Sequence, residues 1–157
     1  MALRKPKNGG LSSALVSVEG YSSDQDAVEL ACELIGGQKG VLYIVYVIEV
    51  ERSLPLDSEI VAATAKGEEV LKAMERVADP FKCDVHAEML QSRRAGLAIV
   101  QEAADKQVDA IVLGANYATH YGSFSLGETV PYVLSKAPCR VILWRNAVVQ
   151  DSVNGVG

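Results

Sequence analysis

The sequence has little of the chemistry that metal sites and disulfides need. Its 157 residues include three cysteines, Cys32, Cys83 and Cys139, and two histidines, His86 and His120. An odd number of widely spaced cysteines gives neither a disulfide framework nor a C-x-x-C pair. Structural zinc is held by nitrogen and sulfur ligands at close spacing, and two scattered histidines argue against such a site. We therefore expect free, buried thiols, with redox or metal chemistry as the minor alternative, and no bound metal.

Long apolar runs and an excess of basic residues are also missing. No apolar stretch approaches the roughly 20 residues that a membrane-spanning helix needs. Arg4, Lys5 and Lys7 are followed by glycine and serine, so they do not introduce a signal peptide. Fifteen Lys and Arg against twenty Asp and Glu give a net charge of -5, which argues against a nucleic-acid partner. These absences predict a soluble, cytoplasmic protein.

Apolar segments of strand length alternate with segments of helical periodicity along most of the chain. A chain of 157 residues favours one domain. We expect it to span residues 11–146, between a flexible lead-in (1–10) and a flexible tail (147–157). The first helix is expected to begin near Gly20, with Ser22 or Ser23 as its cap, and to end at Gly36. Alternating strands and helices imply right-handed βαβ units and a parallel sheet covered on both faces. The expected elements are strands at 14–18, 41–50, 85–90, 110–113 and 140–144, with later helices at 60–77, 95–106 and 126–136.

The segment 112–145 carries the strongest functional signal. An apolar run ends at Gly114, a loop rich in glycine, serine and tyrosine follows, and Gly127 precedes a helical pattern that Pro138 ends. In open parallel sheets, ligands bind beyond the carboxyl ends of the strands, where the winding reverses. The glycines therefore stand where a phosphate-binding loop would place them.

From residue 11 to residue 145 the chain resembles the universal stress protein family. The resemblance rests on the pattern G-x-x-G, nine residues, G-[S/T], with Gly114 and Gly127 at its first and third glycines, and on the ending APCRVILWR (137–145). It implies a Rossmann-like three-layer α/β sandwich with a five-stranded parallel sheet of order 3-2-1-4-5. It also implies a homodimer, which in this family often forms through the last strand, here Arg140 to Trp144. An edge strand with an apolar face is a ready surface for pairing with a second copy.

ATP-binding members of the family place the nucleotide near an acidic residue after the first strand and over the glycine loop. Carried over, the residues facing a nucleotide are Glu19, Val47, Gly114, Asn116, Tyr117, Gly127, Glu128 and Thr129.

Three of these positions depart from the pattern of the family. Glu19 replaces the usual aspartate but keeps its charge, whereas the other two departures change the chemistry. Tyr117 replaces the second glycine and brings a side chain to a place where backbone must approach an anion. Glu128 brings a carboxylate to the helix start, where it could use the free N–H groups itself. It would also repel a phosphate by about 4 kcal/mol per charge at about 4 Å and an effective dielectric constant of about 20. We therefore expect no nucleotide cofactor, with ATP or AMP binding as the alternative.

A second resemblance concerns the segments VIEVERSLPLDSEI (47–60) and GSFSLGETVPYVLSKAPCR (122–140). They resemble stress-protein domains appended to amino-acid permeases of the cationic transporter type, which implies a membrane transporter as a partner in cis or in trans.

No catalytic constellation is present. Ser123 and Ser125 follow His120 in a polar loop, but there is no G-x-S-x-G elbow. Arg93 and Arg94 could attract an acidic ligand or simply flank a helix, and Glu49 could line the cleft or be a solvated charge. The sequence thus predicts a non-catalytic regulatory or ligand-sensing domain.

Overall fold

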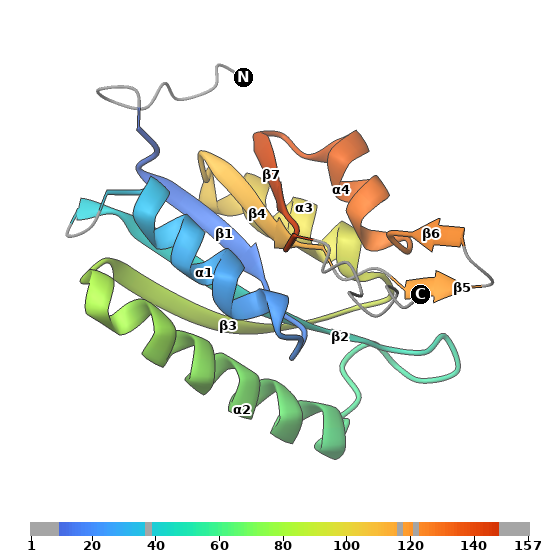
Figure 1. Cartoon of the computed structure of the whole chain (residues 1–157). Helices are drawn as coiled ribbons and strands as arrows, with labels where there is room; N and C mark the ends of the chain where they lie inside the picture. The colour runs from blue at the N-terminus through green and yellow to red at the C-terminus, as the bar shows by residue number, and fades with distance from the viewer. Residues whose placement is uncertain (1–9, 37–38, 116–117, 121–122, 148–157) are drawn as a thin grey trace, which may run out of the picture.

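A parallel sheet of five strands forms the centre of the protein in this computed structural model (Figure 1). The structure describes residues 10–36, 39–115, 118–120 and 123–147. In spatial order the strands are β3 (Asp84–Ser92), β2 (Val41–Glu49), β1 (Ser13–Ser17), β4 (Ala110–Gly114) and β7 (Arg140–Trp144). Each neighbouring pair is parallel. Because β7 is the fifth strand of this sheet along the chain, the predicted order 3-2-1-4-5 is confirmed.

Two helices cover each face of the sheet, which gives three layers (Figure 1). On one face lie α1 (Ser23–Leu34) and α2 (Val61–Ala78), which is followed by the 3-10 turn η3 (Asp79–Phe81). On the other face lie α3 (Ala95–Lys106) and α4 (Thr129–Lys136). The limits predicted for the helix at 95–106 and the strand at 140–144 match the structure.

Burial along the strands explains why the middle of the sheet reads as continuous apolar sequence. Leu15 and Val16 on β1 are fully buried and point into opposite helical layers, because successive side chains of a strand alternate between its faces. The edge strands β3 and β7 are much less buried and carry charged residues. The sheet therefore has a closed centre and two open edges.

Three local predictions need correction. The last helix begins at Thr129 rather than at 126, because Gly127 adopts a φ of +73° and turns the chain before the helix starts. The loop before it contains a small antiparallel hairpin that was not predicted, β5 (Ala118–His120) with β6 (Ser123–Ser125), which projects near the start of α4 (Figure 1). Ser22 stands at the N-cap of α1 but makes no side-chain capping hydrogen bond.

The predicted lead-in and tail fall almost entirely outside the described residues. Within the part of the chain that the structure describes, no helix has the length and apolar character to span a bilayer.

Candidate functional site

A cavity of about 300 Å³ opens where the carboxyl ends of β1 and β4 meet the start of α4. The β1–α1 loop forms one wall, and the turn before α4 forms the other. Along the sheet, β1 is followed on one side by β2 and on the other by β4, so the winding reverses at this place. The cavity thus occupies the position at which open α/β sheets bind ligands. Its lining consists of Ser17, Glu19, Tyr21, Asp24, Leu113, Gly114, Ser125, Leu126, Gly127, Glu128, Thr129 and Val130.

Five of the eight predicted site residues are brought together in this lining. Val47 is not among them: its partly buried side chain packs into the core beneath α3 and α4. Asn116 and Tyr117 lie outside the described residues, so their predicted contribution stays a prediction. The five that line the cavity are Glu19, Gly114, Gly127, Glu128 and Thr129.

Of the lining residues that sequence reasoning missed, Asp24 is the one with a charged side chain. One oxygen of its carboxylate, Oδ2, accepts hydrogen bonds from the backbone N–H groups of Glu19 at 3.1 Å, Gly20 at 2.7 Å and Tyr21 at 3.0 Å. Gly20 has a φ of +96°, which lets the loop curl around that oxygen. Consecutive N–H groups of this kind form an anion-binding concavity. In this protein the chain's own carboxylate fills it.

Partial burial raises the pKa of two carboxyl groups of the site, those of Asp24 and Glu19. Asp24 is 4% exposed, and burial raises its pKa although the three backbone hydrogen bonds act in the opposite direction. The pKa of Glu19 is also raised, first by burial and then by the charges of Asp24 and Glu49, while Lys66 on α2 acts to lower it. Lys66 is exposed and does not line the cavity. A bound anion would thus meet carboxylates that already repel one another.

The two predicted loop positions, 114 and 127, require glycine for different physical reasons. At Gly114 a Cβ atom would lie 2.9 Å from Oγ of Ser23, so the end of β4 can approach α1 closely only without a side chain. At Gly127 a Cβ atom would meet nothing within 4 Å, but the φ of +73° favours glycine. Gly114 therefore serves packing, and Gly127 serves the turn that starts α4.

Glu128 does not cap the start of α4 with its carboxylate, as the sequence had suggested. It occupies the N-cap of α4 and is exposed, yet its side chain makes no capping hydrogen bond. The expectation that its carboxylate uses the helix N–H groups is therefore wrong. Within the turn, the N–H of Gly127 instead donates to Oγ of Ser125 at 3.1 Å. Glu128 contributes to the site only as a negative charge in the cavity wall.

Charged residues at the ends of β2 and β3 have structural partners. Nη1 of Arg93 donates to the carbonyl oxygens of Val50 at 3.3 Å, Glu51 at 2.6 Å and Leu54 at 2.8 Å, and so holds the loop after β2. Oε1 of Glu49 accepts the N–H of Ala95 at the start of α3, at 3.1 Å. Neither Arg93 nor Glu49 lines the cavity.

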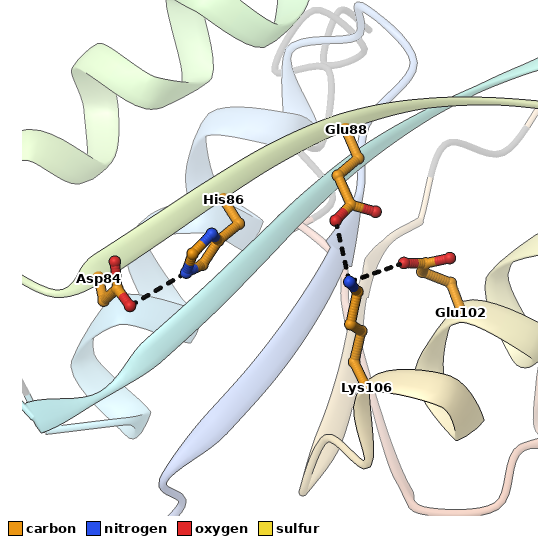
Figure 2. A network of polar contacts seen from close by, with 5 residues as sticks. All are labelled: Asp84, His86, Glu88, Glu102 and Lys106. Carbon is orange, nitrogen blue, oxygen red and sulfur yellow. Dashed lines mark hydrogen bonds and ion pairs between the residues drawn. The ribbon is translucent and has the colours of Figure 1, made fainter.

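A second polar cluster lies away from the cavity, between β3 and the end of α3 (Figure 2). Lys106 points between Glu88 at 3.3 Å and Glu102 at 3.8 Å, and His86 contacts Asp84 at 3.0 Å. Burial and the neighbouring Glu88 raise the pKa of Glu102 to about 7. The ion pair between Lys106 and Glu88 couples the edge strand β3 to α3.

The chemistry of the cavity follows from the charges of its lining. That lining contains three carboxylates and no lysine or arginine. Among the described residues, no group of three or more His, Cys, Asp and Glu side chains is arranged to hold a metal ion. Hydroxyls from serine, threonine and tyrosine supply the remaining polar groups. Such a lining suits a ligand that carries hydroxyl or amino groups better than one that carries several negative charges.

Comparison with known proteins identifies the family of this fold. A model of the universal stress protein family matches residues 12–145. A universal stress protein of Methanocaldococcus jannaschii is 26% identical over 135 residues, covering 82% of this chain and 79% of the relative.

Two solved structures share the fold at low sequence identity. A universal stress protein of Archaeoglobus fulgidus in complex with dAMP has a TM-score of 0.66 at 18% identity, over 83% of this chain and 95% of that one. A family member of Arabidopsis thaliana with AMP bound has a TM-score of 0.62 at 15% identity, over 87% of this chain and 93% of that one. Since the family model spans nearly the whole sandwich, the chain belongs to the universal stress protein family.

Proposed function

We propose that this chain is a non-catalytic, ligand-sensing universal stress protein domain whose cavity selects against highly charged nucleotides. The observation that carries the proposal is the lining itself, in which Glu19, Asp24 and Glu128 are the charged residues. A phosphate within about 4 Å of one such carboxylate would be repelled by about 4 kcal/mol per charge at an effective dielectric constant of about 20. Relaxation and solvent reduce this value, but half of it still weakens affinity by more than tenfold.

The cavity supports a ligand of nucleoside size. Its volume of about 300 Å³ is at the lower end of the range for small-molecule sites. The related structures with AMP and dAMP bound suggest adenine nucleosides as the first ligands to test. An uncharged ribose could pair with Glu19 and with the hydroxyls of Ser17 and Thr129, which all line the cavity. The preferred ligand would therefore be a nucleoside or another small polyhydroxylated molecule.

The second candidate function is that of an ATP- or AMP-binding stress protein with weak or no hydrolysis. The same two relatives favour it, because each holds a nucleoside monophosphate. For this chain it requires Glu128, which is exposed and free of a capping bond, to turn away from an incoming phosphate. The two candidates differ in the effect of a phosphate group on affinity: it weakens binding in the first and strengthens binding in the second.

Isothermal titration calorimetry with adenosine, AMP, ADP and ATP separates the two candidates. We expect adenosine to bind more tightly than AMP and ATP to bind most weakly, because each added phosphate brings further negative charge to the cavity. Incubation with ATP should release no inorganic phosphate above a buffer blank. Submicromolar ATP binding, or phosphate release abolished by Thr129→Ala, would establish the alternative.

A homodimer through β7 is part of the proposal. The strand lies at the edge of the sheet, where β4 is its only partner among the described residues, and Leu143 on it is 37% exposed. Pairing with a second copy would cover this edge. Sedimentation equilibrium at micromolar concentration should give the mass of a dimer, and Leu143→Lys, at the exposed position of the strand, should shift it to a monomer. A monomeric unmodified chain would refute this part.

The context that we propose is the cytoplasmic face of an amino-acid transporter, acting in cis or in trans. The support is the resemblance of segments 47–60 and 122–140 to permease-linked stress-protein domains. Addition of the chain to vesicles that contain a cationic amino-acid permease should change the rate of arginine uptake. An unchanged rate, together with no co-sedimentation with the vesicles, would remove the transporter from the proposal.

A further inference from the structure

Two cysteines that are far apart in the sequence meet in the core on the side of α1 and α2. The Sγ atoms of Cys32 and Cys83 are 3.8 Å apart, although 51 positions separate the residues. Cys32 lies on α1 and is 1% exposed, whereas Cys83 is half-buried and directly precedes β3. Cys139 packs into the core on the opposite side of the sheet. The three thiols are free, so a close pair and a separate third thiol share one chain.

We propose that Cys32 and Cys83 form an oxidisable dithiol, which a hydroperoxide converts into a disulfide that fastens α1 to the start of β3. A disulfide bond is about 2.05 Å long, so the sulfur atoms must approach each other by somewhat less than 2 Å. Cys83 can provide this movement because it lies outside any helix or strand, next to Lys82, whose φ of 61° marks the turn. The packed helix can then stay in place.

The difference in exposure between the two thiols sets the order of the reaction. Burial, the neighbouring Cys83 and the charges of Glu29 and Glu33 raise the pKa of Cys32 to about 12, so Cys32 remains a thiol. The half-buried Cys83 gives the oxidant its access. The sulfur of Cys83 attacks one peroxide oxygen, which forms a sulfenic acid and releases water when the oxidant is hydrogen peroxide.

In the second step Sγ of Cys32 attacks Sγ of Cys83. The S–S bond forms, the S–O bond breaks, and the hydroxide leaves as water with the proton of Cys32. In sum, two thiols and one peroxide give one disulfide and two waters. The peroxide is reduced by two electrons, and both sulfurs are oxidised.

The disulfide would lie away from the ligand cavity. Asp24 at the cavity and Cys32 are eight residues apart on α1, which is about 12 Å along a helix. Oxidation would close the chain between residues 32 and 83 and restrict the unfolded state, so the oxidised protein should have a higher Tm. Ligand titration on the reduced protein is unaffected by this chemistry, so the failure of either proposal can be recognised separately.

Peptide mapping of the unmodified protein tests the inference without any substitution. The folded chain is treated with hydrogen peroxide, quenched with N-ethylmaleimide in denaturant and digested without reductant. We expect a peptide pair joined through Cys32 and Cys83 within one chain, with Cys139 alkylated, and we expect dithiothreitol to remove the link. Peroxide treatment of the urea-unfolded chain, the control for geometry, should give pairs that include Cys139.

Variants identify the role of each thiol. Cys139→Ser should crosslink at the rate of the unmodified protein, whereas Cys83→Ser should form no intramolecular link and show no rise in Tm after peroxide treatment. Recovery of Cys83 as sulfinic or sulfonic acid beside an alkylated Cys32 would overturn the inference. So would a link between chains, or no oxidation of either residue.

Discussion

The substitution Asp24→Ala tests whether the chain's own carboxylate occupies an anion site at the cavity. It removes the acceptor of three backbone hydrogen bonds, from Glu19, Gly20 and Tyr21. A hydrogen bond to a charged group is worth about 1.5–3 kcal/mol. Water can replace part of the loss, because the three donor residues are exposed, and removal of Asp24 also relieves the cost of its burial. We therefore expect the free energy of unfolding to fall by about 2 kcal/mol, the value of one such bond.

The same substitution should change which ligands the cavity accepts. At about 6 Å and an effective dielectric constant of about 20, one unit of charge repels another by about 3 kcal/mol. If solvent and relaxation halve this value, the affinity for AMP relative to adenosine should rise about tenfold in Asp24→Ala. The three freed N–H groups add donors for the phosphate and act in the same direction.

Urea denaturation and calorimetry measure these two effects, and Asp26→Ala is the matched control. Asp26 lies in the first turn of the same helix but does not line the cavity, so its loss reports the effect of charge at the helix start alone. If Asp24→Ala behaved like Asp26→Ala in both assays, the carboxylate would not be filling an anion site and the reasoning would be refuted.

Three further substitutions test other parts of the account. Tyr117→Gly combined with Glu128→Ser should create or strengthen nucleotide binding in calorimetry, and no gain would show that these residues are not the obstruction. Glu102→Gln should raise Tm at about pH 8 but barely at about pH 4.5. The folded protein loses stability as pH rises through the Glu102 pKa of about 7, because the carboxyl group then ionises, whereas glutamine stays neutral. A shift in Tm that does not depend on pH, like that expected for the exposed control Glu68→Gln, would contradict this. Arg93→Met removes three hydrogen bonds from the guanidinium to the loop after β2, and water replaces part of them, so amide hydrogen exchange in that loop should increase about tenfold. Unchanged exchange would show that the loop keeps its conformation without Arg93.

The sequence was sufficient to predict the sheet because each strand and helix is marked by an apolar pattern within its own short segment. Buried parallel strands such as β2 are continuous apolar runs, and α3 combines apolar periodicity with polar neighbours, so both could be recognised within short windows. The last helix was predicted too early because its periodicity extends back to Leu126, whereas its start is set by the left-handed conformation of Gly127.

The site was predicted only in part, because its key contacts depend on folding rather than on residue type. Ser22, Ser23 and Asp24 are consecutive and all prefer the start of a helix, and the curl at Gly20 decides that Asp24 takes the N–H groups. The partners of Arg93 come from residues about 40 positions away, and no local pattern marks them. Long-range pairing therefore limits what the sequence alone can say about this site.

A crystal structure of the chain grown with excess ATP tests the central claim most directly. We predict that no triphosphate lies over Gly127, that Oδ2 of Asp24 still accepts its three backbone hydrogen bonds, and that any bound molecule occupies the cavity through uncharged groups. A triphosphate seated at the start of α4, with the Glu128 side chain turned away from it, would contradict the account.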